Sequence, residues 1–197
     1  TLVLKPNREI NFKPGQFFFL RLDGRKLYAR HPFSVSSSPL EKDIHFTVKL
    51  AGRFTQEAYK LKPGDEVKVE GPFGEFLLDD TKDVVFIAGG VGITPFLNMI
   101  KYNKSEDTKK NILLLYSSKT EEDIIFKKEL DSINEKWLKK FYVLSREKGR
   151  KRKYEIGRIG KNMLLKYVKN LNNKKFYICG PRLMNRDISQ ALRELGV

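Results

Sequence analysis

The sequence is poor in the residues that usually build disulfides, metal sites and catalytic triads. It contains one cysteine, Cys179, and two histidines, His31 and His45, in 197 residues. A disulfide framework and a cysteine-based zinc site within the chain are therefore excluded, and no iron–sulfur cysteine cluster is present. We expect no metal site. A single cysteine also favours a reducing, cytoplasmic setting.

Long apolar runs are missing as well. The longest, such as residues 84–88 and 112–116, have the length of a strand, whereas a membrane helix needs about 20 apolar residues. The chain starts with a strand-like segment and has no basic-then-apolar secretory start. Hydrophobic residues make up 40% and charged residues 32%, which is typical of globular proteins.

Acidic residues are scarce relative to basic ones, and unevenly so. Residues 1–80 hold 13 Lys/Arg and 11 Asp/Glu, a net charge of +2, whereas residues 81–197 hold 26 and 13, a net charge of +13. The excess peaks in residues 145–161, which fit a solvated loop, or a contact for a phosphate-rich ligand, an acidic partner or an anionic membrane surface. We expect no nucleic-acid partner, because the segment lacks a recognition motif and interleaved aromatic residues.

Residues 1–80 show the rhythm of a small β domain. Short β-branched or aromatic runs alternate with Gly- and Pro-rich turns such as Asp23-Gly24, a spacing typical of a small antiparallel barrel or sandwich. The expected strands are residues 16–22, 32–37, 44–50 and 66–70. The pattern TQEAYKL at residues 55–61 predicts a short helix capped by Thr55.

Residues 81–197 change to longer units. Continuous apolar strands are expected at residues 84–88, 112–116, 141–145 and 175–179, with helices at 95–102, 121–135, 161–170 and 185–195. The strand starts lie 28, 29 and 34 residues apart (112−84, 141−112 and 175−141), the length of a βαβ unit. This half is predicted to be a doubly wound parallel sheet of the α/β class. The boundary between domains 1–80 and 81–197 is expected in the polar segment 79–83.

A glycine-rich turn, GGVGITP at residues 89–95, follows the first strand of the second half. Ligands of doubly wound sheets bind at the carboxyl ends of the strands. Gly90 and Gly92 would let the backbone approach a pyrophosphate, while Thr94 caps the next helix and Pro95 occupies its first turn. Pro95 replaces the third glycine of the usual G-x-G-x-x-G pattern, so the turn alone also fits a tight strand–helix connection.

Two cations follow the next strands. Lys119 comes after the second strand, where an acidic residue would favour NAD, and Arg146 follows the third. Their charges favour a 2′-phosphate and hence NADPH over NADH. Cys179 ends the fourth strand and is either a small buried residue or part of a site. A nucleophilic role is disfavoured because both histidines lie in the other half.

The first half contains a second candidate site. The motif HPFSVSS at residues 31–37 places hydroxyl groups next to an aromatic ring and an imidazole, although such a strand edge could also simply be satisfied internally. Gly52 and Thr55 then open a short helix whose N-terminus could bind a phosphate. A second nucleotide-like ligand is therefore expected in this half.

Six short motifs, each weak alone, occur in a characteristic order. They are PGQFFFLRL (14–22), HPFSVSS (31–37), VKLAGRFT (48–55), GPFGEF (71–76), AGGVGITPF (88–96) and CGPRLM (179–184). Together they resemble the ferredoxin–NADP reductase superfamily over essentially the whole chain. HPFS is most similar to the FAD/NAD(P)-binding dehydrogenase domain of ferric reductases and NADPH oxidases. The wider family has an arginine where this chain has His31, and Arg30 lies one place earlier.

The resemblance implies FAD in the first domain and NADPH or NADH in the second. Phe33 would pack on the flavin ring and Ser34 would hydrogen-bond near flavin N5. Cys179 would lie beside the nicotinamide ring, and with Ser34 it is the expected catalytic residue. The remaining cofactor-binding residues would be His31, Pro32, Lys49, Gly52 and Thr55 in the first half, and Gly90, Gly92, Thr94, Pro95, Lys119, Arg146, Gly180, Pro181 and Met184 in the second.

The implied activity is hydride transfer from NAD(P)H to FAD, followed by electron transfer to a haem, an iron chelate or a carrier protein. The alternative is an electron-transfer subunit without independent turnover. Both ends look trimmed relative to the family. We therefore expect a fragment, or the cytoplasmic part of a longer reductase that works at the cytoplasmic face of a membrane.

Overall fold

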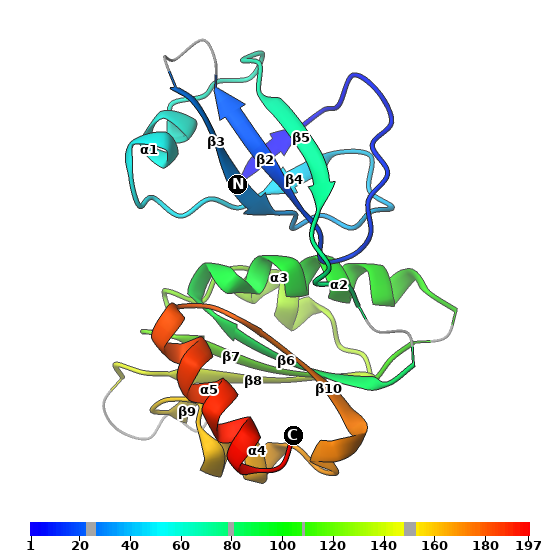
Figure 1. Cartoon of the computed structure of the whole chain (residues 1–197), viewed down its shortest axis with the longest axis vertical. Coiled ribbons are helices and arrows are strands. Elements are labelled where there is room, and N and C mark those ends of the chain that lie inside the picture. Colours follow the sequence, from blue (N-terminus) through cyan, green and yellow to red (C-terminus); the bar gives the residue numbers. More distant parts are fainter. Residues whose placement is uncertain (23–26, 79–80, 108, 148–152) are drawn as a thin grey trace. The chain divides into compact units, whose positions relative to one another are not determined.

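The structure is a computed structural model that describes residues 1–22, 27–78, 81–107, 109–147 and 153–197. The chain forms two compact units, shown in Figure 1: Thr1–Leu78 with Thr94–Ser105, and Asp79–Ile93 with Glu106–Val197. The turn expected at Asp23-Gly24 lies outside the described residues. Within the described ranges, no helix is both long enough and apolar enough to span a membrane.

The first unit is built from two antiparallel sheets. Its strands are β1 (Leu2–Leu4), β2 (Phe17–Leu22), β3 (Leu27–Ser34), β4 (Ile44–Phe46) and β5 (Lys68–Phe73). One sheet pairs β1 with β4 and the other has the order β3-β2-β5, with a single bridge between Val35 and Phe46. The antiparallel β domain is thus confirmed, although the strands predicted at 32–37 and 44–50 end earlier than expected.

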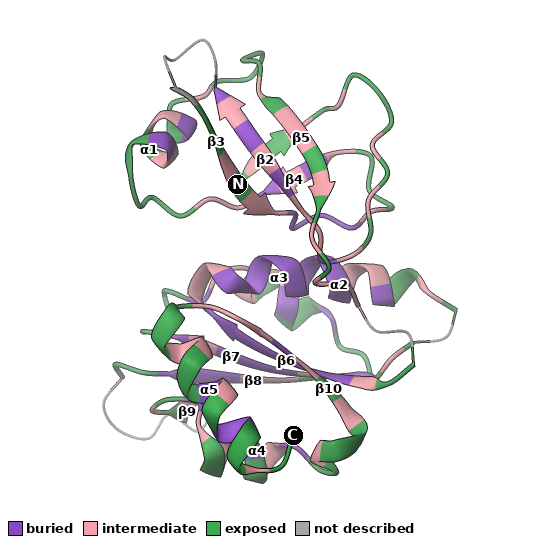
Figure 2. Ribbon diagram, viewed as in Figure 1, coloured by how far each residue is buried: buried purple, intermediate pink, exposed green. Residues whose placement is uncertain are grey.

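The core of the first unit follows from alternation along β2. Phe18, Leu20 and Leu22 are buried and face the interior, while the side chains between them are only partly buried (Figure 2). Phe18 meets Phe46 of the other sheet edge-to-face, with ring centroids 6.1 Å apart. The two sheets therefore share one aromatic core.

Two helices complete the first unit, α1 (Arg53–Tyr59) and α2 (Thr94–Ser105). The prediction that Thr55 caps α1 is wrong. Gly52 is the N-cap and Thr55 is the third helical residue, where its hydroxyl accepts hydrogen bonds from the N–H groups of Ala51 and Gly52 at 2.9 and 3.0 Å. Thr55 closes the turn from inside the helix.

The second unit contains a five-stranded sheet. Its strands are β6 (Asp83–Gly89), β7 (Ile112–Ser118), β8 (Leu138–Leu144), β9 (Glu155–Ile156) and β10 (Lys174–Cys179). Their order is β10-β6-β7-β8-β9 and every neighbouring pair is parallel. The predicted parallel sheet is confirmed, and the short edge strand β9 was not predicted.

Helices lie on both faces of this sheet (Figure 1). The helices α4 (Lys161–Tyr167) and α5 (Arg182–Glu194) share a buried cluster with side chains of one face, including Val85, Ile87 and Val143. The helix α3 (Lys127–Ser132) lies on the other face, where Asp131 accepts a hydrogen bond from the Tyr142 hydroxyl at 2.7 Å. Two short 3-10 helices, η2 (Gly90–Ile93) and η3 (Leu171–Asn173), precede α2 and β10.

The helix predicted at residues 121–135 is shortened to α3. Asp123 accepts hydrogen bonds from the N–H and the hydroxyl of Thr120, at 3.2 and 3.1 Å. The N–H of Ile125 is bonded to the Tyr116 hydroxyl, and Phe126 has a left-handed backbone with φ of 59°. These side-chain bonds compete with helical ones and delay the helix until Lys127.

Candidate functional site

The strand order of the second unit defines where a ligand can bind. The chain runs outward from β6 through β7, β8 and β9, and then returns to place β10 on the other side of β6. In such sheets the ligand crevice opens at the carboxyl ends of the two strands where the order reverses. The two motifs AGGVGITPF and CGPRLM follow β6 and β10, so the topology brings them together.

Three glycines at this edge are closely packed, and Gly92 is packed directly against backbone. A Cβ on Gly92 would lie 2.2 Å from the carbonyl oxygen of Cys179, and one on Gly89 would lie 2.8 Å from the Cδ of Pro181. A Cβ on Gly180 would lie 2.3 Å from the Cε of Met184. The turns after β6 and β10 are thus packed directly against each other. The interpretation of a tight structural turn therefore accounts for Gly92, because its Cβ would meet the Cys179 backbone.

Gly90 has a different environment. Its φ is +53°, in the left-handed region that favours glycine, and a Cβ built there meets nothing within 4 Å. Its carbonyl oxygen accepts a hydrogen bond at 3.0 Å from the Tyr116 hydroxyl, which in turn accepts one from the N–H of Ile125. Burial raises the pKa of Tyr116 to about 12, so this hydroxyl stays protonated. Tyr116 therefore fixes the turn through the Gly90 carbonyl, and the space at the Gly90 Cα is left open to a ligand such as a phosphate.

Thr94 and Pro95 are the first two residues of α2, and both are buried. The 3-10 helix η2 runs directly into α2 at Thr94, and Pro95 lies in the first turn of α2 as expected. The capping role of Thr94 stays a prediction.

Lys119 and Arg146 are brought together. The N–H of Arg146 donates to the carbonyl oxygen of Lys119 at 2.9 Å, and the N–H of Ser145 donates to that of Ser118 at the same distance. Both basic residues are exposed. Two cations on adjacent strand ends can contact one anionic group.

Cys179 is the last residue of β10 and pairs in register with Ala88. Burial raises the pKa of its thiol, which is therefore neutral near pH 7. Pro181 and Met184 lie at the start of α5, and Met184 packs against Gly89 and Gly180. A neutral, half-buried thiol fits a shaping role at this edge and does not fit a nucleophile.

The motif HPFS lies at the end of β3. Register with β2 pairs Leu20 with His31 and Phe18 with Phe33, so these two rings share the inner face of the sheet. Both rings contact Phe54 of α1, with centroid distances of 4.2 Å for His31 and 5.7 Å for Phe33.

The alternate residues of β3 lie on the opposite face. Pro32 pairs with Phe19 and Ser34 with Phe17. Arg30 lies over the Phe19 ring at 4.6 Å and forms an ion pair with Glu70 at 3.0 Å. It is therefore held on the face opposite His31.

Lys49 and Gly52 frame the approach to α1. Lys49 is exposed after β4, and Gly52 has an extended backbone with open space around its Cα. The Thr55 hydroxyl donates to the Gly52 carbonyl at 2.8 Å and accepts from two N–H groups, so its bonding capacity is used within the loop. The open Cα of Gly52 and the exposed Lys49 fit a bound pyrophosphate better than Thr55 does.

Two residues with a role at these sites were not predicted. Phe54 is part of the GRFT motif, but the motif gives it no role. Its contact with His31 and Phe33 depends on where α1 packs. Tyr116 was counted as one of five apolar strand residues, and only the pairing of β6 with β7 places its hydroxyl next to Gly90. No group of three or more metal-ligating side chains occurs among the residues that the structure describes.

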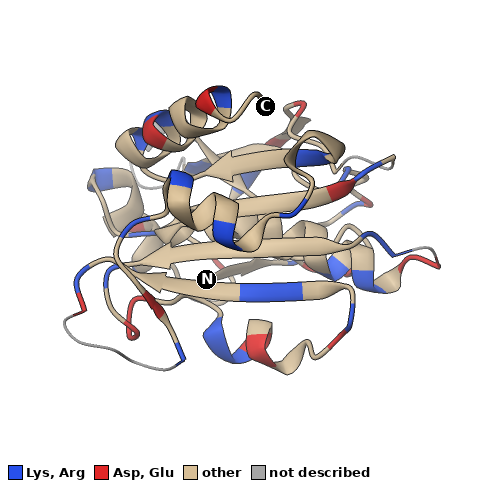
Figure 3. Ribbon diagram, turned by 90° about the horizontal axis from the view of Figure 1, so that it is seen from below, with Lys and Arg blue, Asp and Glu red and all other residues tan. Residues whose placement is uncertain are grey.

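The basic segment 145–161 is only partly described. Lys148, Arg150, Lys151 and Arg152 lie outside the described residues. Of the remainder, Arg146, Lys153 and Arg158 are exposed, and Lys161 pairs with Glu194 at 3.7 Å. Figure 3 shows the described Lys and Arg spread over several helices, strands and loops.

Two family models match the chain. The model described as "Oxidoreductase NAD-binding domain" matches residues 86–190, and that described as "FAD-binding domain" matches residues 2–76. The first covers most of the second unit and more than half of the whole chain. The second covers the β domain that contains HPFS and GRFT.

Curated relatives include proteins of several kinds. The chain is 32% identical over 194 residues to NADH-cytochrome b5 reductase 1 of Dictyostelium discoideum, covering 92% of this chain and 66% of that protein. Two relatives come from Pyrococcus furiosus. A probable dihydroorotate dehydrogenase B (NAD(+)), electron transfer subunit, is 36% identical over 64% of this chain and 46% of its own length. Sulfhydrogenase 1 subunit gamma is 30% identical over 94% of this chain and 64% of its own length. The chain thus spans between 46% and 66% of these relatives.

Solved structures share the fold. The cytochrome b5 reductase domain of Ulva prolifera nitrate reductase superposes with a TM-score of 0.86 at 21% identity, over 99% of this chain and 86% of that one. A ferredoxin NADP+ reductase from Neisseria gonorrhoeae gives 0.81 at 23% identity, over 98% and 84%. At these identities the likeness establishes the arrangement of the two units' elements and nothing finer.

Proposed function

Because the chain belongs to the ferredoxin–NADP reductase-like superfamily of FAD- and NAD-binding oxidoreductases, we propose that it transfers electrons from NAD(P)H through FAD to a protein or carrier acceptor. The observation that carries this proposal is the pairing of the two matched domains, each with a glycine that has open space at its Cα, Gly52 and Gly90. The chemistry supplied by the bound flavin is hydride acceptance and electron release.

In the first unit, Phe33 would pack against the flavin ring and Ser34 would hydrogen-bond near its N5 atom. His31, Pro32, Lys49, Gly52 and Thr55 would hold the remainder of FAD. The half-buried His31, Phe33 and Ser34 and the open Gly52 support this assignment. Thr55 contributes by ordering the loop, because its hydroxyl is already bonded to residues 51 and 52.

In the second unit, the dinucleotide would lie along the carboxyl edge of the sheet. Gly90 and Gly92 of this unit, followed in the chain by Thr94 and Pro95 at the start of α2, would hold its pyrophosphate. Lys119 and Arg146 would bind a 2′-phosphate. Gly180, Pro181 and Met184 would shape the nicotinamide pocket beside Cys179. The neutral thiol would exclude water there without taking part in proton transfer.

The acceptor is the least constrained part of the proposal. The HPFS motif supports a haem or an iron chelate, as in ferric reductases and NADPH oxidases. The relatives add protein partners to the candidate acceptors, because two of them are named as subunits and one as a cytochrome b5 reductase. We therefore propose a redox protein or carrier as acceptor, with a reducing, cytoplasmic setting.

The proposal is tested by purifying the protein and recording its visible spectrum. We expect a yellow protein, or one that FAD renders yellow, whose flavin band is bleached by NADPH under anaerobic conditions. A colourless protein that FAD cannot reconstitute would contradict the proposal.

A second assay separates a self-sufficient reductase from an electron-transfer subunit. A self-sufficient reductase turns over NADPH with ferricyanide as a free acceptor. An electron-transfer subunit is reduced once by NADPH and then stops until its partner enzyme is added.

A further inference from the structure

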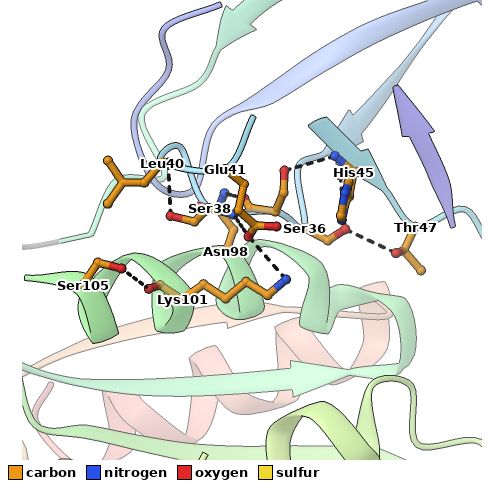
Figure 4. Close-up of polar contacts among 10 residues, drawn as sticks. Ser36, Ser38, Leu40, Glu41, His45, Thr47, Asn98, Lys101 and Ser105 are labelled. Carbon is orange, nitrogen blue, oxygen red and sulfur yellow. Dashed lines mark hydrogen bonds and ion pairs between the residues drawn. The ribbon is translucent and has the colours of Figure 1, made fainter. Parts of the chain in front are cut away.

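The helix α2 carries two buried carboxamides, Asn103 with 1% exposure and Asn98 with 0% exposure. Figure 4 shows Asn98 on α2 together with Ser38, Glu41 and Lys101. The Oδ1 of Asn98 accepts a hydrogen bond from the N–H of Gly15 at 2.9 Å, and its Nδ2 donates to the carbonyl oxygen of Ser37. Both halves of the amide are thus used on backbone groups, and neither is used on another side chain.

The two bonded groups flank the strand pair that contains HPFS. Gly15 lies two residues before β2, and Ser37 lies three residues after Ser34. Phe17 pairs with Ser34, and the N–H of Val35 donates to the Gln16 carbonyl at 3.5 Å. Asn98 therefore spans the end of the β2–β3 pair at which Ser34 is located.

Each of the two backbone segments is fixed by its own neighbours on one side and by this amide on the other. Gly15 has a φ of +100°, and a Cβ there would lie 1.9 Å from the carbonyl oxygen of Phe76, so the turn is packed against its neighbours. On the other side, the N–H of Ser36 donates to the His45 carbonyl at 2.8 Å, and the Ser37 hydroxyl accepts from the N–H of His45 at 3.0 Å. The segment after Ser34 is fixed by β4 through its side chains and by α2 through Asn98.

We infer that Asn98 is a positioning residue for the flavin: it fixes the backbone that carries Phe33 and Ser34 to the helix that begins with Thr94 and Pro95. The inference rests on the proposed function, because it assumes that FAD binds at HPFS. An apolar residue would fill the same space without setting the distance between Gly15 and Ser37. A buried amide with two backbone partners does set it, because each unmade bond leaves a buried polar group unpaired.

The variant Asn98→Asp makes the inference testable in one protein. A protonated aspartic acid can accept from Gly15 and donate to Ser37, as the amide does. The ionised form would instead direct a negative oxygen at the Ser37 carbonyl. Since burial raises the pKa of a carboxyl group, the variant should resemble the wild type in mild acid and lose the clamp as the pH rises.

Other titratable groups near this position are Glu41, Lys101 and His45. Glu41 and Lys101 form an ion pair at 3.4 Å, and Glu41 accepts from the N–H of Ser38 at 2.6 Å. All three are present in the wild type, which therefore serves as the control for their contribution. Ile100→Ala is the matched control for stability, because it removes a buried side chain of α2 and leaves the two Asn98 bonds intact.

The experiment measures FAD affinity and the flavin visible spectrum from about pH 5 to about pH 8, together with amide exchange at Gly15 in the flavin-free protein. For Asn98→Asp we expect FAD affinity to fall at least about tenfold over this range, with a shifted flavin spectrum and faster exchange at Gly15. The wild type and Ile100→Ala should show no such pH dependence.

The inference would be overturned if Asn98→Asp bound FAD with the same affinity at every pH and the Gly15 amide stayed protected from exchange throughout. A loss of affinity that Ile100→Ala reproduces at equal stability would overturn it as well. A wild type that binds no FAD at any pH would instead refute the proposed function, so the two failures are distinguishable.

Discussion

Lys119 and Arg146 are the residues expected to distinguish NADPH from NADH. In the double variant Lys119→Glu/Arg146→Glu we expect kcat/KM for NADPH to fall by at least about tenfold, because two charge-assisted contacts to the 2′-phosphate become repulsive. The value for NADH, which lacks that phosphate, should change little. Flavin bleaching rates with the two dinucleotides measure the effect.

Lys169→Glu is the control for this pair, since it changes an exposed lysine beyond α4, away from the strand ends. An equal loss for NADPH and NADH in the double variant would remove Lys119 and Arg146 from the 2′-phosphate site.

Alanine substitutions at Gly52 and Gly92 should affect different properties, FAD affinity at Gly52 and stability at Gly92. Gly92→Ala places a Cβ 2.2 Å from the Cys179 carbonyl oxygen, so we expect a loss of stability of about 1–3 kcal/mol from overpacking. Gly52→Ala meets nothing within 4 Å, and its extended backbone suits any residue. Its stability should change by less than about 0.5 kcal/mol, while FAD affinity falls because the methyl group occupies the ligand's approach. Urea unfolding and FAD titration separate the two effects, and unchanged FAD affinity in Gly52→Ala would argue against a pyrophosphate at this turn.

At this scale the sequence predicts residues whose role follows from a local motif. The glycines alone predicted the turn after β6. The apolar runs that precede Cys179, Lys119 and Arg146 predicted that these residues lie at or just after strand ends. Asn98, Phe54 and Tyr116 could not be found in this way, because their partners lie far away in the sequence. Asn98 is 83 positions from Gly15, and no pattern within α2 indicates that partner.

The helix α3 depends on one carboxylate. Asp131 accepts from the Tyr142 hydroxyl at 2.7 Å and pairs with Lys127 at 2.6 Å. Burial acts to raise the pKa of Asp131, but the hydrogen bonds from Lys127 and Tyr142 outweigh it and hold the pKa below its ordinary value. The unfolded chain therefore takes up the proton first as the pH falls.

The resulting stabilisation is complete above the ordinary pKa of aspartate and is lost as the pH falls through the lower, folded value. For Asp131→Asn we expect a loss of less than about 1 kcal/mol near neutral pH, because the pair is partly exposed, and a weaker acid dependence of unfolding. Urea denaturation near neutral and acidic pH checks both. Asp187→Asn, which removes the carboxylate of an exposed pair with Arg186, is the matched control variant.

Element boundaries were predicted less well than element types. Strands and helices were expected in the right order because apolar runs and amphipathic segments are local signals. Their ends depend on competing bonds, such as those of Asp123 and Tyr116 that delay α3, and on αL residues such as Asn170 beyond α4. The two-residue strand β9 exists only because β8 offers it an edge.

For the whole molecule, FAD should act as a stabilising ligand. Binding to the folded chain alone raises stability by RT ln(1 + [L]/Kd), about 2.7 kcal/mol at a hundredfold excess over Kd. For a chain of this size we expect Tm to rise by about 5–10 °C. Thermal unfolding followed by circular dichroism with and without FAD measures it, and riboflavin, which lacks the pyrophosphate, should give a smaller shift. An identical Tm with and without saturating FAD would count against a built flavin site.

The fold class was accessible from the sequence because the two halves have different hydrophobic periods. The grouping of α2 with the first unit was not accessible, since the helix follows β6 directly in the chain. That grouping depends on tertiary bonds such as those of Asn98 and Lys101.

The position of β10 next to β6 has a consequence for synthesis. Asp83 pairs with Lys174, so the two strands that frame the dinucleotide edge leave the ribosome far apart in time. Until β10 emerges, one edge of β6 has no strand partner, and parallel pairings over such sequence distances form slowly. The first unit ends at Ser105, so all of its residues are translated well before β10 emerges.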